Sequence, residues 1–491
     1  MPSEKNHESP ANMALEPPLC VDLDGSLVRT DTLAESLLGL VKADFWTLCK
    51  VPIWLLRGRA YCKSQIAAKY IPNPTDLPYN AELIADLRRD KAAGRTLVLV
   101  TAADIKIANA VADSMGIFDR VMASDGQTNL KSSRKADRLV AEFGAKGFDY
   151  VGDSRADVSV WAVARRSILA KASTRVQASA KREAVEFWRI YSDPNPIRLQ
   201  VISKVLRLHQ WLKNLLLFVP LITSLSVLHA DKVAMAALGF FIFGLCASSV
   251  YVTNDLLDVN ADRQHARKRL RPFASGTISP WVGFWLAPVL LAAGVWLAVA
   301  TMSATFVLTL VIYIVTTFAY SIYLKRVVLV DVTLLAMLYT LRIIAGAFAL
   351  QVEPSSWLLA FSLFLFLSLA LIKRYSELLE AHESGVIWIA GRGYKSTDLR
   401  LLMSLGTAAG CVSVLVLALY LDSDQVKVLY SRPFILWLLC PLQLYWIARM
   451  WMQAERANLQ DDPVVFAVKD RVTRGIGVVG ALVIAAAAWP V

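Results

Sequence analysis

The sequence predicts two fold classes in one chain. Residues 15–190 are expected to form an α/β, Rossmann-like domain with a small helical cap. Residues 200–491 are expected to form an all-α polytopic membrane domain of nine transmembrane helices. Hydrophobic residues make up 56% of the chain and gather in long runs after residue 205. A membrane buries such runs, because about 20 apolar residues span its hydrocarbon.

Short apolar segments in the first part alternate with amphipathic helical patterns. The expected strands are residues 19–23, 96–100, 120–123 and 148–151. The helical patterns cover residues 79–93, 105–115, 133–142 and 156–164. This alternation predicts a parallel sheet with helices on both faces. Because ligands of such sheets bind beyond the carboxyl ends of the strands, the polar residues there are candidates for a site.

Four of the expected strand ends carry residues suited to phosphate chemistry. Asp22 and Asp24 follow the first strand, and two carboxylates at this spacing can serve as nucleophile and general acid/base. Thr101 ends the second strand with a hydroxyl group, and Lys131 follows the third with a cation. The last strand leads to two carboxylates suited to Mg²⁺, Asp153 and Asp157.

These four motifs, in this order, resemble the haloacid dehalogenase (HAD) superfamily of phosphohydrolases. The resemblance implies that Asp22 attacks phosphorus and that Asp24 protonates the leaving oxygen and then activates water. It also implies that Thr101 and Lys131 bind the phosphoryl group. The expected Mg²⁺ ligands are Asp22, Asp24, Asp153 and Asp157. Ser26 stands where the family usually has threonine, which leaves a hydroxyl group in place.

The insertion at residues 31–78 is expected to be the helical cap. Two roles are equally expected for its apolar stretch, residues 45–56. One is to form the core of the cap, and the other is to form a surface that touches a bilayer or a lipid-linked substrate. The chain between the two domains, residues 171–204, is basic and contains Pro194 and Pro196, which stop a helix. We therefore expect the boundary at residues 190–200 and contact of the basic residues with anionic lipids.

The apolar runs of the second part define nine expected spans. They are residues 208–228, 233–253, 281–300, 303–322, 327–350, 356–372, 401–420, 431–450 and 473–490. Loops after the second, fourth, sixth and eighth spans hold most of the basic residues, which predicts that these loops face the cytoplasm. The amino-terminal domain and both sites would then be cytoplasmic, with the carboxyl terminus outside. This asymmetry largely explains the net charge of +12, so we expect an inner- or plasma-membrane protein with no nucleic-acid partner.

An Asp-rich segment follows the second span. Asp255, Asp258 and Asp262 are spaced i, i+3, i+7, which places them on one helix face. Three carboxylates in this arrangement favour Mg²⁺ that bridges a diphosphate. Neighbouring groups suited to phosphate or sugar oxygens are Asn254, Arg263, His265, Lys268 and Arg271.

A second polar cluster is expected at the ends of later spans. Asp331 and Arg342 are eleven residues apart, roughly 16 Å along a helix and on the same face. An arginine deep in a span is normally functional or paired. The other expected substrate-binding residues of this part are Lys213, Asn214, Tyr320, Lys325, Lys373 and Arg374.

Residues 200–490 resemble the UbiA superfamily of membrane prenyltransferases. The segment NDLLDVNAD matches the family's first Asp-rich motif, and nine spans match its fold. The family's second Asp-rich motif is absent, because the corresponding segment YSIYLKRVVLVD has only Asp331. This departure is similar to the decaprenyl-phosphate phosphoribosyltransferase branch, as are the segments HQWLKN, KRY and DDPVVF at residues 209–214, 373–375 and 461–466.

The resemblance implies a Mg²⁺-dependent transfer of phosphoribose from phosphoribosyl diphosphate to a polyprenyl phosphate, in a site that contacts membrane lipids. The fusion leads us to expect that the first domain removes the 5-phosphate of the product. Two alternatives stay open. One is transfer of a prenyl group from a prenyl diphosphate to an aromatic or other small acceptor. The other is a transporter or lipid-binding module with an enzymatic head.

Overall fold

The computed structural model describes residues 16–171, 173–191, 199–224, 226–265, 267–383, 393–459 and 462–489. The chain divides into two compact units. The first unit joins Met1–Val205 with Thr253–Trp285, and the second joins Leu206–Val252 with Leu286–Val491. The Asp-rich segment therefore belongs to the first unit. The expected boundary at residues 190–200 stays a prediction, because most of it lies outside the described residues.

The first unit contains a six-stranded parallel sheet in the order β3-β2-β1-β4-β5-β6. The strands are β1 Leu19–Val21, β2 Leu97–Asp104, β3 Arg120–Ser124, β4 Asp149–Gly152, β5 Ser167–Leu169 and β6 Phe187–Ile190. The four predicted strands are confirmed, and β5 and β6 extend the sheet at one edge. The order places β1 between β2 and β4, so that Asp22 lies at the centre of the sheet's carboxyl edge.

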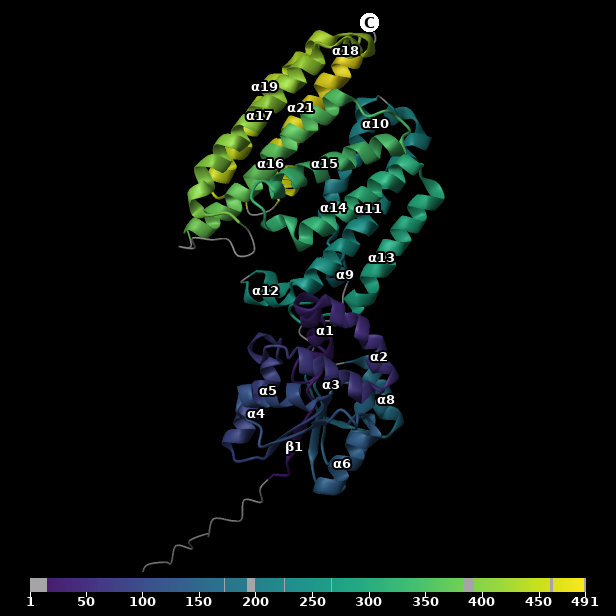
Figure 1. The fold of residues 1–491 in the computed structure, drawn as a ribbon, viewed down its shortest axis with the longest axis vertical. Helices are drawn as coiled ribbons and strands as arrows, with labels where there is room; N and C mark the ends of the chain where they lie inside the picture. Colours follow the sequence, from purple (N-terminus) through teal and green to yellow (C-terminus); the bar gives the residue numbers. More distant parts are fainter. Residues whose placement is uncertain are drawn as a thin grey trace, which may run out of the picture. The chain divides into compact units, whose positions relative to one another are not determined.

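Alternate strand residues build two hydrophobic cores, one on each face of the sheet. Leu97 and Leu99 pack on one face with α4 Ala81–Ala92 and α5 Ile105–Met115. Val98 packs on the other face. In Figure 1, α6 and α8 lie on the opposite side of the sheet from α4 and α5. The helices of that second face are α6 Ser133–Phe143, α7 Val158–Val163, which follows the 3-10 turn η3 Arg155–Asp157, and α8 Thr174–Arg182. The predicted α/β layers are thus confirmed.

The insertion between β1 and β2 is helical, as expected of a cap. Its elements are α1 Thr32–Ala43, η1 Phe45–Lys50, α2 Val51–Leu56, α3 Arg59–Lys69 and η2 Pro74–Asp76. Trp54, Cys62 and Ile66 form a small core within it. Trp46 and Leu56 are 78% and 89% exposed. The apolar stretch therefore contributes to the cap core and also presents an apolar surface.

The rest of the first unit is the end of α11, α12 Val259–Gln264, η6 Lys268–Leu270 and the start of α13, with α9 Leu199–Val205 before them. Arg271 and the following turn, residues 272–279, connect η6 to α13. The structure thus groups this connection between two spans with the sheet and the cap.

Within the described residues, eight helices are long and apolar enough to cross a membrane. The long helices are α11 Ala230–Leu257, α13 Pro280–Thr301, α14 Ala304–Ile322, α15 Val330–Ala349, α16 Ser356–Glu383, α17 Leu399–Leu421, α19 Leu439–Glu455 and α21 Arg471–Ala488 (Figure 1). Short elements between them are η7 Leu324–Arg326, η8 Ser396–Asp398, α18 Asp424–Leu429, η9 Pro433–Leu438 and α20 Pro463–Lys469. The chain is an integral membrane protein with the predicted polytopic helical fold.

The first of the nine expected spans differs from the prediction. Residues 208–228 form the 3-10 helix η4 Leu208–Phe218, then α10 Val219–Thr223 and η5 Ser226–Leu228. Pro220 is the second residue of α10, and it lacks the N–H that would continue a helical ladder from η4. A side chain at Gly346 of α15 would overlap the backbone of Leu217, so η4 packs closely on α15. This contact brings the polar residues of η4 to α15.

Candidate active sites

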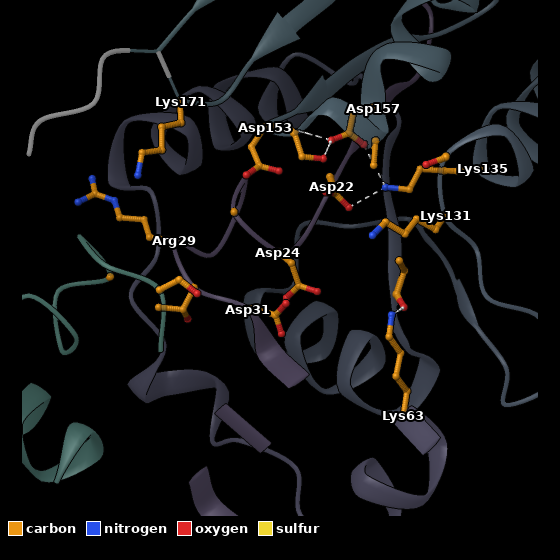
Figure 2. Close-up of a pocket in the computed structure, with 18 of the residues that line it drawn as sticks. Asp22, Asp24, Arg29, Asp31, Lys63, Lys131, Lys135, Asp153, Asp157 and Lys171 are labelled. Carbon is orange, nitrogen blue, oxygen red and sulfur yellow. Dashed lines mark hydrogen bonds and ion pairs between the residues drawn. The ribbon is translucent and has the colours of Figure 1, made fainter. Parts of the chain in front are cut away.

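A cavity of about 370 Å³ opens at the carboxyl edge of the sheet (Figure 2). We call it the carboxylate pocket, because Asp22, Asp24, Asp153 and Asp157 all line it. Asp22 follows β1 and Asp153 follows β4, its neighbour in the sheet. Asp157 ends the short η3 turn after β4. The parallel order of the strands thus gathers these carboxylates at one edge.

A buried lysine links two of the aspartates. Lys135 of α6 donates from its Nζ to Asp22 Oδ1 at 2.9 Å and lies 3.4 Å from Asp157 Oδ1. It also donates to the Tyr150 hydroxyl at 2.8 Å, which in turn donates to Asp157 Oδ1 at 2.8 Å. The other oxygen of Asp157 accepts from the amide and hydroxyl of Ser154. These contacts fix Asp22 and Asp157 in place.

The pocket offers a set of ligands suited to a hard cation. Within the described part of the chain, Asp22, Asp153 and Asp157 offer carboxylate oxygens that all lie within 4.8 Å of one another. Gly25 has a φ of +79°, and a side chain there would overlap the Asp153 carboxylate. The glycine therefore permits both the turn after β1 and the close approach of Asp153. Converging carboxylate oxygens are what Mg²⁺ prefers, so these residues fit that ion.

The pKa shifts around Lys135 agree with a local crowding of the three carboxylates of Asp22, Asp153 and Asp157. Burial, opposed by the charge of Lys135, raises the pKa of Asp22 to about 6. Burial and then Asp157 and Asp22 raise the pKa of Asp153 well above its usual range. Burial alone would lower the pKa of Lys135, but the carboxylates of Asp22 and Asp157 raise it. A divalent cation would offset the mutual repulsion of these carboxylates.

Asp24 lies apart from the group of three and has a different environment. Its Oδ1 accepts from the amide of Thr32, at the start of α1, at 2.7 Å. Burial, followed by the charge of Asp31, raises the pKa of Asp24 to about 7. A carboxyl with such a pKa is able to give and take a proton near neutral pH, as general acid/base catalysis requires.

The two other predicted residues of this pocket lie at different depths. Thr101 is fully buried and its hydroxyl accepts from the Ala103 amide, while Ala102 lines the cavity. Lys131 lines the cavity, whereas the amine in contact with Asp22 is that of Lys135. The roles predicted for Thr101 and Lys131 stay predictions. Lys135 was missed because both lysines follow β3, and only the register of α6 shows which of them turns inward.

In the Asp-rich segment, an arginine joins two carboxylates. Arg271 NH1 lies 3.2 Å from Asp255 Oδ1 and 2.7 Å from Asp262 Oδ2. Both carboxylates are almost fully buried, and Asp258, between them in the sequence, occupies the residue position before α12. Burial, opposed by Arg271, raises the pKa of Asp262. The guanidinium thus occupies the position between the carboxylates of Asp255 and Asp262. Within the described residues, the carboxylates that converge to within 4.8 Å as a group of three are those of Asp22, Asp153 and Asp157. The Mg²⁺ role of Asp255, Asp258 and Asp262 therefore stays a prediction.

The predicted phosphate-binding neighbours of this segment are placed differently from one another. Lys268 and His265 are exposed, and His265 Nδ1 accepts from the Arg267 amide at 3.2 Å. Asn254 is half-buried near the end of α11. Arg263 forms a buried ion pair with Glu35 of α1, in which NH2 lies 2.6 Å from Oε1. The structure thus gives Arg263 a partner in the cap.

In the second unit, two lysines and a tyrosine from three helices contact one carboxylate. Asp462 Oδ2 lies 2.8 Å from Lys213 Nζ of η4 and 2.9 Å from Lys373 Nζ of α16. Its Oδ1 accepts from the hydroxyl of Tyr339 of α15 at 2.9 Å. The charges of both lysines overcome the effect of burial and lower the pKa of Asp462.

Arg342 lies one turn after Tyr339, and its hydrogen-bond partners are uncharged. Its guanidinium donates to Asn214 Oδ1 at 3.1 Å, to the Tyr313 hydroxyl at 2.9 Å and to the Leu338 carbonyl at 2.6 Å. We call Lys213, Arg342 and Lys373, with Asp462, the cationic cluster. Glu377 is a further negative charge that acts on Lys373. The three cations are donors suited to phosphate oxygens.

The remaining predicted residues of this unit divide into two sets. Asp331 and Arg374 form a fully buried ion pair at 2.8 Å, and Tyr394 donates to Asp331 at 2.5 Å. These two residues are therefore partners of one another. Tyr320 and Lys325 are half-buried at the end of α14 and in η7. Asp461, of the predicted DDPVVF segment, lies outside the described residues.

Sequence reasoning did not include Asp462, Tyr339 or Tyr313 in this site. Asp462 precedes Pro463, and its carboxylate caps α20 by accepting from the Val464 amide. An Asp-Pro pair before a helix is typical of a helix cap. The pattern alone therefore does not indicate that Asp462 also binds Lys213 and Lys373. The two tyrosines lie within apolar runs, where an aromatic residue normally indicates core packing.

Comparisons with known proteins agree with this architecture. The model of the UbiA prenyltransferase family matches residues 216–469, just over half of the chain. An uncharacterized protein of Sinorhizobium fredii, y4nM, is 37% identical over 463 residues, which cover 94% of this chain and 89% of the relative. Because almost the whole chain is covered, this likeness includes the α/β part.

Two further relatives cover a smaller share of this chain. The nodulation protein NoeC of Azorhizobium caulinodans is 36% identical over 54% of this chain and 85% of its own length. The decaprenyl-phosphate phosphoribosyltransferase of Mycolicibacterium smegmatis is 31% identical over 57% of this chain and 92% of its own length. The family match, the membrane helices and these relatives lead to one conclusion: the chain belongs to the UbiA prenyltransferase family and is a membrane transferase.

Proposed function

We propose that the chain transfers phosphoribose from phosphoribosyl diphosphate to a polyprenyl phosphate, and that its α/β part then removes the 5-phosphate from the product. The cationic cluster is the observation that carries the first step. Lys213, Arg342 and Lys373 are buried or half-buried around Asp462. An acceptor that is itself a phosphate would be bound by these cations, whereas a neutral aromatic acceptor would bring no negative charge to Arg342, whose hydrogen-bond partners Asn214, Tyr313 and Leu338 are neutral.

The relatives support the same choice of substrates. One of them is named a decaprenyl-phosphate phosphoribosyltransferase, and 92% of its length aligns with this chain. The second unit also contains an apolar cavity of about 510 Å³, lined by residues such as Phe361, Leu417 and Ile484. Such a cavity is chemically suited to hydrocarbon. A polyprenyl chain is therefore a reasonable partner for this unit.

In the transfer, the bond between C1 of the ribose and the diphosphate breaks, and an oxygen of the polyprenyl phosphate forms a new bond to C1. Asp255, Asp258 and Asp262 would hold Mg²⁺, which supplies positive charge to the leaving diphosphate. Arg271, which pairs with Asp255 and Asp262, would then be available to bind phosphate oxygens. The acceptor is already anionic, so the step needs no general base.

In the hydrolysis, Asp22 would attack the phosphorus of the 5-phosphate and form an aspartyl-phosphate. Asp24 would protonate the departing sugar oxygen and then take a proton from the water that releases inorganic phosphate. Lys135, bound to Asp22, would stabilise the negative charge of the phosphoryl group. Asp22, Asp153 and Asp157 would hold Mg²⁺, which supplies further positive charge at the phosphoryl oxygens.

The order of the steps implies that both sites face the same side of the membrane. The basic loops between the spans predict that this side is the cytoplasm. The predicted domains, residues 15–190 and 200–491, would then act in sequence on one lipid. The product would be a polyprenyl-phosphoryl-ribose.

Two assays of the purified full-length protein test the two activities separately. With Mg²⁺, phosphoribosyl diphosphate and a polyprenyl phosphate, mass spectrometry of the lipid should detect an added pentose. Turnover with a prenyl diphosphate and an aromatic acceptor instead would refute this proposal in favour of prenyl transfer to a small acceptor. In the other assay, purified phosphoribosylated lipid should release inorganic phosphate, and a lipid that stays intact would refute the phosphatase step.

A further inference from the structure

The carboxylate pocket contains more cations than one phosphoryl group needs. Lys135 binds Asp22, and Lys63 donates to the Ala102 carbonyl at 2.6 Å. Arg29 and Lys171 also line the pocket. Figure 2 shows these two side chains on one side of the aspartates, opposite Lys63 and Lys135. The pocket therefore has a cationic side that is separate from the place where Asp22 would react.

The wall beside Arg29 comes from the connection between α11 and α13. Gly276, Thr277 and Ser279 line the pocket with Arg29, although they lie about 250 residues later in the chain. Gly276 has a φ of +72°, and a Cβ there would lie 2.8 Å from the Arg29 Cβ. The turn at residues 276–279 thus touches the side chain that offers the charge and adds hydroxyl groups next to it.

A buried ion pair holds this turn against the cap. Arg263 donates from Nε to the Ala274 carbonyl at 3.0 Å. Its two terminal nitrogens lie 3.1 and 2.6 Å from the two carboxylate oxygens of Glu35. The two side chains are 7% and 2% exposed. A two-point pair of this kind fixes geometry as well as contributing energy, so the turn has a defined position at the pocket.

We propose that Arg29, Lys171 and the turn at residues 276–279 form a second anion subsite, which binds a phosphodiester on the same substrate whose phosphomonoester reaches Asp22. Asp31 is a further acidic group of the wall, and it lies next to Asp24 (Figure 2). The subsite rests on the proposed phosphatase activity and narrows its substrate class. The substrate is a sugar that carries two phosphate groups, of which one is a terminal monoester.

Two substrates carry an anionic group on C1 of ribose together with a 5-phosphomonoester. One is a lipid-linked phosphoribose, in which the second group is a phosphodiester to the lipid. The other is free phosphoribosyl diphosphate, in which the second group is a diphosphate. The subsite is assigned to the diester, because a diphosphate usually binds through a divalent ion. The converging carboxylates suited to such an ion are Asp22, Asp153 and Asp157, at the reacting group.

The test uses the full-length protein in detergent with Mg²⁺ and measures release of inorganic phosphate. The three substrates are ribose 5-phosphate, its 1-(methyl phosphodiester) and phosphoribosyl diphosphate. The changes are Arg29→Gln and Lys171→Gln, and their controls are Arg88→Gln and Lys106→Gln, which alter exposed cations of the same unit. An Arg29→Lys variant keeps the charge, and the Tm of each variant reports its folding.

For the wild type, kcat/KM should be highest for the diester. In Arg29→Gln and Lys171→Gln, the ratio of kcat/KM for the diester to that for ribose 5-phosphate should fall about tenfold, through KM, because a charge-assisted hydrogen bond is lost. Arg29→Lys should restore part of the ratio, and the controls should keep it.

An equal loss for both substrates would overturn the subsite, because both residues would then serve the scissile phosphate. A wild type that prefers phosphoribosyl diphosphate would overturn the assignment to a diester. A wild type that hydrolyses none of the three, nor the full phosphoribosylated lipid, would refute the phosphatase itself. The last result is distinct from the first two, in which hydrolysis is observed.

Discussion

The carboxylate pocket and the cationic cluster have opposite arrangements of charged side chains. In the first, the buried amine of Lys135 is surrounded by the carboxylates of Asp22 and Asp157. In the second, the buried carboxylate of Asp462 is surrounded by the amines of Lys213 and Lys373. In both places tyrosine hydroxyls, of Tyr150 and Tyr339, complete the hydrogen bonds.

This difference predicts the charge of the ligand that each site binds. A buried site with surplus carboxylates is stabilised when a cation binds, and one with surplus amines is stabilised when an anion binds. The single opposite charge in each site serves to hold the others in position. The balance of charge thus predicts a metal ion in the first site and a phosphate group in the second. The changes below test these two predictions.

Removal of Mg²⁺ should have the largest effect. Chelation with EDTA should abolish both activities, because the carboxylates of the pocket and of the Asp-rich segment then repel each other and the substrates' phosphates. Adding Mg²⁺ back should restore both rates, and the far-UV circular dichroism should stay constant throughout. Full phosphatase activity in EDTA would show that Asp22, Asp153 and Asp157 work without a divalent ion.

The two lysines after β3 offer a matched test within the carboxylate pocket. Lys135→Gln should lower phosphatase kcat by about 10²- to 10³-fold, because a charge beside the reacting phosphoryl group is lost. Lys131→Gln removes a lysine from the rim of the same pocket and should have a much smaller effect. Phosphate release at saturating substrate measures both, and the reverse order would return the role to Lys131.

Removing the carboxylate of the cationic cluster should affect the other activity. Asp462→Ala leaves Lys213 and Lys373 buried without their partner, so we expect a lower Tm and about a 10²-fold loss of transferase kcat/KM. Phosphatase activity should persist. Asp422→Ala is the control, because the Asp422–Lys427 pair is exposed and contributes little. Equal effects of the two changes would contradict the role given to Asp462.

The smallest expected effect is that of one hydroxyl group. Tyr339→Phe keeps the ring and removes the hydrogen bond to Asp462, which is worth about 1 kcal/mol, or about fivefold in transferase kcat/KM. The same change should leave phosphate release from a purified phosphoribosylated substrate constant. A loss as large as that of Asp462→Ala would mean that the hydroxyl itself touches the substrate.

The sequence predicted the fold well where periodicity is strong. The four strands of the sheet core and the long apolar helices appear where apolar runs predicted them. The first span was the exception, because its apolar composition concealed the break before Pro220. The strands β5 and β6 were not predicted, although they are as long as β1 and β4.

The candidate sites were harder to predict because they depend on contacts between distant segments. Asp22 and Asp153 could be proposed from strand ends, since parallel strands meet at one edge. Lys135 could not, because its contact with Asp22 joins residues 113 positions apart. The same holds for Lys213 and Asp462, which are 249 positions apart. Residue type and local pattern name candidates, but the partner of each charge comes from the tertiary structure.

The most direct test of the account compares the lipid product of the wild type with that of Asp22→Asn. Each purified protein is given Mg²⁺, phosphoribosyl diphosphate and a polyprenyl phosphate, and the lipid is analysed by mass spectrometry. We predict a lipid with ribose from the wild type and a lipid with ribose 5-phosphate from Asp22→Asn, at equal rates of transfer. The same product from both proteins, or no pentose on the lipid at all, would contradict it.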